Sequence, residues 1–214
     1  MITRMPGLSS SLQYTSRVSR SAAGRTRPRF ASLGLAILAT VMSLVVLAPS
    51  AQADRVINGI LVGGKIEEAY AQSGGFWKWG VPTGPERASA KRGRYQTFAR
   101  DASFYWHPAV DGGTAHQVGG AIRTRWQKVG AERGALGFPV TNEYKSGSGR
   151  SNDFQGGVVT WSKAGGAQIV WGGILQKWRA HGGAKGYYGV PLGGEYRSGG
   201  RFAQDFLNGT IFWP

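Results

Sequence analysis

One eight-residue phrase recurs three times in this chain of 214 residues. The copies read WGVPTGPE at residues 79–86, LGFPVTNE at 136–143 and YGVPLGGE at 188–195. Their prolines, Pro82, Pro139 and Pro191, are 57 and 52 residues apart. Internal self-similarity at a period of this length is typical of repeat architectures, in which small supersecondary units stack on one another. The repetition therefore constrains the fold more strongly than the composition does.

Each copy follows an apolar pair at i and i+4: Ile66 with Tyr70, Ile122 with Trp126, and Ile174 with Trp178. Such a pair lies on one face of a helix. Glycines follow each pair, as they commonly follow the ends of helices. We therefore expect one short helix per repeat, with Trp126 and Trp178 as structural residues of the core.

The phrase itself predicts a sharp corner after the helix. Proline restricts the preceding residue to an extended conformation, and Gly80, Gly137 and Gly189 can take the positive φ that a tight redirection needs. The apolar residue between them is then buried, which stabilises the fold by roughly 1.5–3 kcal/mol. We interpret these prolines and glycines as structural.

A glutamate lies four residues after each proline, at Glu86, Glu143 and Glu195. Our preferred interpretation is structural: each carboxylate accepts backbone N–H groups within its own proline turn. The alternatives are a repeated ligand contact and catalysis. Catalysis is the weakest, because a catalytic pair needs two different environments to separate its pKa values, whereas a repeat gives equivalent positions similar environments.

Downstream of each phrase, a polar glycine-rich loop ends in Arg94, Arg150 or Arg201, and a strand then leads to Trp106, Trp161 or Trp213. Alternating and β-branched residues predict a β-hairpin here. The third copy stops before its return strand, and residues 55–62 resemble the missing half. The sequence predicts an α+β repeat protein of three helix–proline-turn–β-hairpin units, near residues 62–118, 119–170 and 171–214, with an N-terminal half-repeat at 55–62. We expect residues 55–62 to pair with residues 206–213 and close a propeller-like ring; an open array is the alternative.

The first 53 residues read as a secretory signal. Six arginines and no acidic residue lie in residues 1–30, an apolar run follows at 31–48, and Ala51-Gln52-Ala53 offers a cleavage site after Ala53. An N-terminal membrane anchor is the alternative, because about 18 apolar residues can just span a bilayer. The mature chain, residues 54–214, carries 20 Lys/Arg against 11 Asp/Glu, a net charge of +9, which favours anionic partners. Export argues against nucleic acid as that partner.

The sequence offers no catalytic, cofactor-binding or metal-binding set. Cysteine is absent, the three histidines occupy no equivalent positions, and no Gly-x-Ser-x-Gly elbow occurs. The eight tryptophans, all within residues 54–214, are the better functional lead, because flat aromatic faces at loop ends suit stacking on sugar rings. For the aromatic residues at these strand and loop ends, core packing is the preferred interpretation and a ligand-binding platform is the alternative. The candidate ligand-binding residues are Trp106, Trp161, Trp213, Tyr187, Tyr188, Arg94, Arg150 and Arg201.

These residues resemble the LGFP repeat family of actinobacterial cell-envelope proteins. Leu136-Gly137-Phe138-Pro139 is the motif that gives the family its name, and residues 79–82 and 188–191 are variants of it. The glutamate four residues on and the F-x-G-G-x-x-x-W run at 154–161 also match. The resemblance implies repeats that tether envelope proteins to cell-wall polysaccharide, and a ring-like fold in members with more repeats.

Together these observations predict an exported, non-catalytic module that needs no cofactor and binds cell-wall polysaccharide or another envelope glycan. The alternatives are a wall hydrolase or esterase, and a basic scaffold that contacts anionic lipid or an envelope protein. The sequence is compatible with contact with an envelope surface and with an oligomer.

Overall fold

The computed structural model describes residues 54–214. The leader that we expect at residues 1–53, including its cleavage site, lies outside the described residues. Within the described part, no helix is long and apolar enough to cross a membrane.

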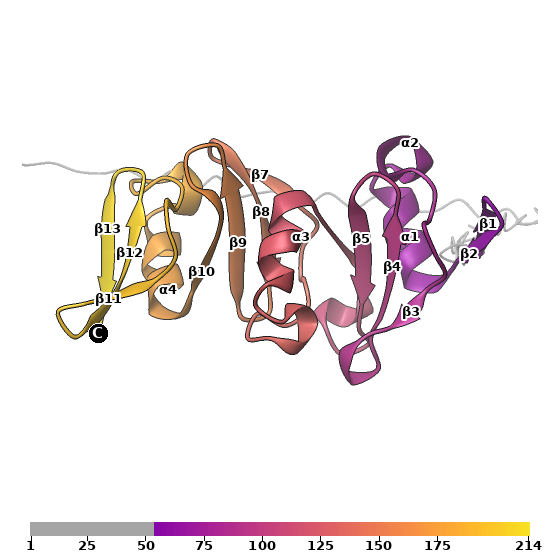
Figure 1. The fold of residues 1–214 in the computed structure, drawn as a ribbon, viewed down its shortest axis with the longest axis horizontal. Coiled ribbons are helices and arrows are strands. Elements are labelled where there is room, and N and C mark those ends of the chain that lie inside the picture. The colour runs from indigo at the N-terminus through magenta and orange to yellow at the C-terminus, as the bar shows by residue number, and fades with distance from the viewer. Residues whose placement is uncertain (1–53) are drawn as a thin grey trace, which may run out of the picture. The chain divides into compact units, whose positions relative to one another are not determined.

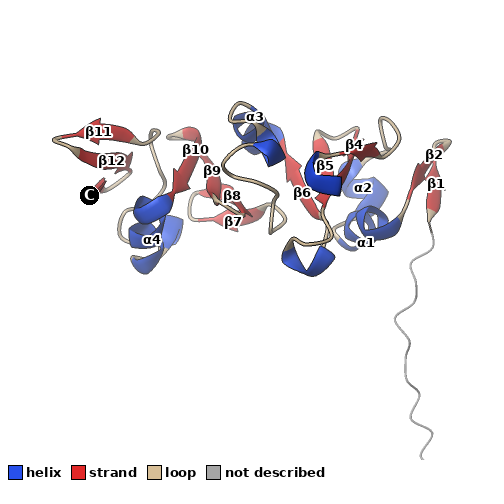
Figure 2. Ribbon diagram, turned by 90° about the horizontal axis from the view of Figure 1, so that it is seen from below, coloured by secondary structure: helices blue, strands red, loops and turns tan. Residues whose placement is uncertain are grey.

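The described chain is an α+β protein in which helices and antiparallel sheets alternate along the sequence (Figures 1 and 2). The helices are α1 (Gly64–Gln72), α2 (Gly75–Trp79), α3 (Gly120–Gln127) and α4 (Gly172–Ala180). The strands are β1 (Arg55–Ile57), β2 (Ile60–Val62), β3 (Arg87–Ala88), β4 (Arg94–Phe98), β5 (Ala102–Trp106), β6 (His116–Gly119), β7 (Tyr144–Ser146), β8 (Gly149–Phe154), β9 (Gly157–Ser162), β10 (Gly166–Trp171), β11 (Tyr196–Ser198), β12 (Arg201–Phe206) and β13 (Gly209–Trp213). As the apolar pairs predict, α1, α3 and α4 are the helices that begin the three repeats.

Each repeat has its own antiparallel sheet, larger than the predicted hairpin. The strand orders are β3-β4-β5-β6, β7-β8-β9-β10 and β11-β12-β13. The predicted single strand from the phenylalanine to the tryptophan is wrong, because Phe98, Phe154 and Phe206 each end a strand (β4, β8, β12) and a turn separates them from β5, β9 and β13. The short strands β3, β7 and β11 are also additional and lie between the proline turn and β4, β8 and β12. The third sheet has no fourth strand among the described residues, as the early end of the third copy predicts.

The expected closure between residues 55–62 and residues 206–213 is wrong. Strand β1 pairs with β2, joining Arg55 to Val62, whereas β13 pairs with β12 alone. Between β1 and β2, Asn58 and Gly59 both have positive φ, 50° and 77°, which a two-residue hairpin turn of type I′ requires. The N-terminal half-repeat therefore forms a local hairpin directly before α1, and no closed sheet occurs in residues 54–214.

Three hydrophobic cores follow one another along the described chain, and the sheets between them contribute to two cores at once. Side chains of a strand point alternately to opposite faces. On β5, Phe104 enters the core of α1 while its neighbour Tyr105 enters the core of α3; on β9, Val159 and Val158 divide in the same way between α3 and α4. The first and second repeats thus bury their sheets partly against the next helix. The described residues of all three cores lie between 57 and 211.

Polar contacts also cross the junction between the second and third repeats. The Arg179 side chain on α4 forms an ion pair with Asp153 on β8, with 3.0 Å between Nη2 and Oδ2. The Tyr144 hydroxyl donates a hydrogen bond of 2.9 Å to the other oxygen of Asp153. Partial burial, together with this bond to a carboxylate, raises the pKa of Tyr144 to about 12.

Candidate functional site

The Gly-x-Pro corners have the same geometry in all three repeats. Gly80, Gly137 and Gly189 have φ of 76°, 66° and 71°, as the sequence predicts. Each proline forms an isolated β-bridge to the phenylalanine that ends the second strand of its sheet. An aromatic side chain of the preceding helix donates a hydrogen bond to the glycine carbonyl: Tyr70 to Gly80 (2.9 Å), Trp126 to Gly137 (3.1 Å) and Trp178 to Gly189 (2.9 Å). The corner is therefore fixed to both the helix and the sheet of its repeat.

The burial of the apolar residue in each corner depends on the repeat or hairpin that precedes that corner. Phe138 is buried in a core that also contains Ala90 and Val110 of the first repeat, and Val190 is buried in a core shared with β9 and β10. Val81, in the first repeat, is only partly buried, and the β1–β2 hairpin is the one described sheet that precedes it. The corner thus stacks one repeat on the preceding one.

A buried amide was missed by the sequence analysis, although it recurs two residues before each phenylalanine. Its NH2 group bridges a strand of the preceding repeat or half-repeat to the proline loop of its own repeat, with bonds of 2.8–3.1 Å. The three residues are Gln96, Asn152 and Gln204, all fully buried. Their fixed spacing from the phenylalanine is the signal that would have found them.

Pockets of similar composition occur in the first and second repeats, at the N-terminal ends of α1 and α3. Each combines an indole, a guanidinium and a carboxylate with the Gly-Gly backbone that begins the helix. The first is lined by Glu86, Arg94, Trp106, Gly63, Gly64 and Ile66, and the second by Glu143, Arg150, Trp161, Gly119, Gly120 and Ile122. Their volumes are about 490 and 290 Å³, within or near the range of small-molecule sites. We call them the Trp–Arg–Glu pockets.

The two Trp–Arg–Glu pockets differ in the side chains that line them and in the hydrogen bonds of those side chains. In the first, the Asp54 carboxylate also lines the pocket and accepts the Gly64 N–H at 3.0 Å, and the Trp106 Nε1–H donates to a backbone carbonyl at 2.8 Å. In the second, the Trp161 side chain is 38% exposed, and Glu143 is the one carboxylate among the described lining residues. The second pocket is therefore the more open to a ligand.

The glutamates of these pockets pair with arginine, which corrects the interpretation that they accept backbone N–H groups. Arg94 Nε lies 3.1 Å from Glu86 Oε1, and Arg150 forms the equivalent ion pair with Glu143. Within residues 54–214, none of the three repeated glutamates accepts a bond from a backbone N–H. Burial raises the pKa of Glu86; Arg94 opposes this shift and the Asp54 carboxylate adds to it.

The third repeat does not form this pocket. The Trp213 ring lies directly against the backbone of Gly173 on α4, where a Cβ would collide with it. Register explains why Arg201 is not equivalent to Arg94 and Arg150: those two pair across the sheet with Trp106 and Trp161, whereas Phe202 pairs with Trp213. Arg201 instead stacks on the Phe212 ring, 4.6 Å from its centroid. Among the described residues, Glu195 forms no ion pair with an arginine.

The remaining candidate aromatic residues lie elsewhere. Tyr187 is 70% exposed beside the third corner, and Tyr188 is partly buried against Phe206; neither lines a Trp–Arg–Glu pocket. Trp126 and Trp178 are buried in the helix positions where the sequence places them.

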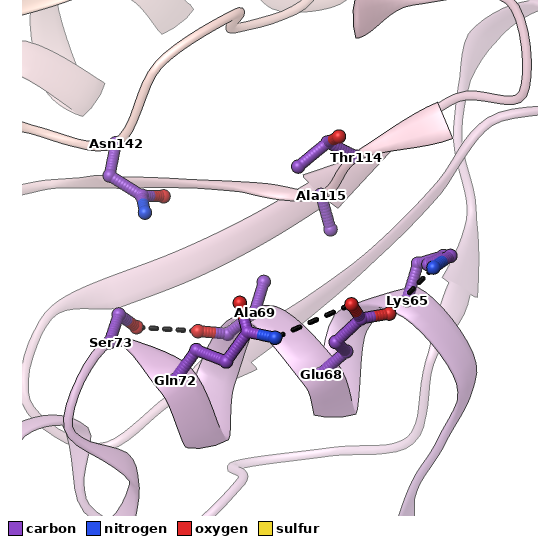
Figure 3. Close-up of a pocket in the computed structure, with 8 residues that line it drawn as sticks. All are labelled: Lys65, Glu68, Ala69, Gln72, Ser73, Thr114, Ala115 and Asn142. Atoms are coloured by element: carbon purple, nitrogen blue, oxygen red, sulfur yellow. Dashed lines mark hydrogen bonds and ion pairs between the residues drawn. The ribbon is translucent and has the colours of Figure 1, made fainter. Parts of the chain in front are cut away.

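A third, more polar pocket lies between α1 and the segment that leads into β6 (Figure 3). Its volume is about 260 Å³. On α1, Lys65 Nζ lies 2.6 Å from Glu68 Oε2, and this contact lowers the pKa of the Glu68 carboxyl. The Ser73 hydroxyl, directly after α1, donates a hydrogen bond to the Ala69 carbonyl. Asn142 faces them from the proline loop of the second repeat. Because these polar groups largely satisfy one another and no aromatic ring lines it, we prefer the Trp–Arg–Glu pockets as the candidate site.

Within the described residues, no group of three or more histidine, aspartate or glutamate side chains is arranged to hold a metal ion. The Trp–Arg–Glu pockets combine groups suited to stacking with groups that donate and accept hydrogen bonds.

The fold and its corners define a repeat protein in which the first and second sheets each pack against the helix of the next repeat. A comparison with family models matches the LGFP repeat twice, over residues 80–134 and 136–186. The chain therefore belongs to the LGFP repeat family. Both matches begin at or beside a Gly-x-Pro corner and extend past the following helix. A comparison with curated proteins finds no match.

Proposed function

We propose that this chain is an exported, non-catalytic module that binds cell-wall polysaccharide or another envelope glycan through its Trp–Arg–Glu pockets. A sugar ring offers an apolar face and a rim of hydroxyl groups. An indole can cover the face, while a guanidinium and a carboxylate bond the hydroxyls. The observation that carries the proposal is the second pocket, where Trp161 is exposed beside the Arg150–Glu143 pair.

The repetition suits a polymer better than a small molecule. Two similar pockets on one chain convert a second weak contact into an intramolecular one, so affinity for a long glycan exceeds that of either pocket. The membership in the LGFP repeat family and the basic mature surface support an envelope location. The third repeat, with Trp213 packed on α4, contributes stability rather than a pocket.

The test is retention of residues 54–214 on purified peptidoglycan, arabinogalactan and lipid fractions, at low and high ionic strength. Stacking on neutral sugar persists at high salt, whereas charge-driven adhesion is screened. We expect Trp161→Ala to weaken retention about tenfold, or ~1.4 kcal/mol. Trp161→Phe keeps an aromatic face and should lose less.

The control is Tyr187→Ala, which removes an exposed ring outside the pockets and should leave glycan retention unchanged. Circular dichroism confirms that each variant is folded. Equal retention of wild type and Trp161→Ala on every glycan fraction, or no retention of the wild type, would overturn the proposal.

A further inference from the structure

The first repeat carries a helical turn, α2, that the other two repeats lack. In its place the second and third repeats have 3-10 turns, Ala131–Arg133 and Gly183–Lys185. The sequence of α2 is GFWKW. Phe76 is 47% exposed and Trp77 is 81% exposed, the highest value of any large apolar side chain among the described residues.

Helix α2 is held firmly at its base, so these two rings project from a fixed support. Trp79, the last residue of the turn, packs edge-on against Phe104, with 5.8 Å between ring centroids, and its Nε1–H donates to Ser73 at 2.9 Å. Phe76 and Trp77 contact each other edge to face at 5.3 Å. Figure 1 shows α2 as a separate turn next to α1, beyond the strands β4 and β5.

Two basic side chains contact the same turn through Trp79 and through the Trp77 backbone. Lys78 extends over the Trp79 ring at 4.4 Å, and the Arg100 guanidinium donates to the Trp77 carbonyl. Neither forms an ion pair with a carboxylate within residues 54–214, and the nearby Asp101 is already paired with Arg123. The turn therefore presents two exposed aromatic rings next to two basic side chains that no described carboxylate neutralises.

We propose that this turn, Phe76-Trp77-Lys78 together with Arg100, is an anchor for an anionic lipid surface. Tryptophan is enriched at membrane interfaces because its ring is apolar with one polar edge, and lysine and arginine beside it attract anionic head groups. Exposed rings of this kind insert into the boundary between head groups and acyl chains.

The shape of the turn distinguishes lipid from the glycan of the proposed function. The two rings are nearly perpendicular and project outward, so they offer no flat platform for a sugar. They line neither the Trp–Arg–Glu pockets nor the polar pocket of Figure 3. Two exposed aromatic rings next to basic side chains fit a negatively charged lipid surface.

The experiment measures co-sedimentation of residues 54–214 with vesicles of phosphatidylglycerol mixed with phosphatidylcholine, and with vesicles of phosphatidylcholine alone. We expect binding to the anionic vesicles, weakened at least about tenfold in the double variant Phe76→Ala/Trp77→Ala. Lys78→Glu should weaken binding at low salt, because it reverses a charge that faces the head groups. Acyl chains that carry bromine should quench tryptophan fluorescence in the wild type and less in Trp77→Ala.

Two matched variants separate the surfaces. Tyr187→Ala removes another highly exposed ring, beside the third corner, and should bind vesicles as the wild type does. Trp161→Ala should also bind vesicles as the wild type does. If the wild type does not co-sediment with anionic vesicles, or if the double variant binds them as tightly as the wild type does, the proposal is wrong. If the double variant instead loses retention on a glycan fraction, α2 is a sugar contact and the lipid assignment fails.

Discussion

The buried amide of Gln204 should contribute measurably to stability, because it joins the third repeat to the second. Its NH2 group donates to the Ile169 and Gly193 carbonyls, both at 2.8 Å, and the residue is fully buried. Gln204→Leu keeps most of the volume but leaves the buried Ile169 carbonyl and the partly buried Gly193 carbonyl without this donor, and the buried one alone costs about 1–3 kcal/mol. The wild-type Oε1 is itself buried without a partner, so the substitution also removes one unsatisfied group.

The net loss should be about 1–3 kcal/mol of the free energy of unfolding. For a chain of this size, that corresponds to a fall in Tm of roughly 2–4 °C per kcal/mol. Urea unfolding followed by circular dichroism measures it. Gln176→Leu is the control, because Gln176 lies on the exposed side of α4 and should change stability by less than ~0.5 kcal/mol.

Gln204→Glu tests the hydrogen bonding more directly, because it keeps the shape and replaces the donor by a carboxylate. An ionised carboxylate facing two carbonyl oxygens is unfavourable, so the pKa of the new group rises in the folded state. The stability of this variant should then be greatest below the ordinary carboxyl pKa and fall as pH rises through the raised one. If Gln204→Leu were as stable as the wild type, and Gln204→Glu showed no such pH dependence, the argument for the amide would be refuted.

Three further predictions concern the corner, a junction and the N-terminal hairpin. Gly137→Ala should lose about 1–3 kcal/mol in urea unfolding, because φ of 66° strains any residue with a Cβ. The Tyr144 phenol should titrate near pH 12 in absorbance at 295 nm, earlier in Asp153→Asn, and the stability that this shift gives is present below pH 10 and lost as pH rises through 12. Arg55→Ala should lose more stability than Glu67→Leu, because it leaves the fully buried Glu67 carboxylate, 3.1 Å from that arginine, without its partner.

The parts of the fold that depend on local sequence could be predicted. The helices follow from the i, i+4 pairs, and the corners follow from glycine before an extended residue and proline.

The predicted pairing of residues 55–62 with residues 206–213 is wrong, because sequence similarity shows which strand a segment resembles and not which strand it pairs with. The Asn58-Gly59 turn pairs β1 with β2 across two residues, and closing so short a loop costs far less chain entropy than joining the two ends of the array.

The candidate site could be predicted in part, and its errors come from register. Counting to the next arginine placed Arg201 with Arg94 and Arg150, but cross-strand pairing counts from the phenylalanine and puts Phe202 opposite Trp213. Because side chains alternate between faces, a shift of one residue moves a side chain to the other face of the sheet. The Asp54 carboxylate in the first pocket depends on the path of the chain before α1, which no repeat pattern encodes.

The side chains that meet at the junctions differ from one junction to the next. One helix position faces the preceding strands at every junction, and its chemistry changes each time: Glu67 with Arg55, Arg123 with Ser103, and Leu175 with Val158. A helix moved to another junction would bury a charge against an apolar or wrongly charged partner, which costs several kcal/mol. The corners and buried amides recur in every repeat, whereas these three pairs differ between junctions and match each helix to the strands on which it packs.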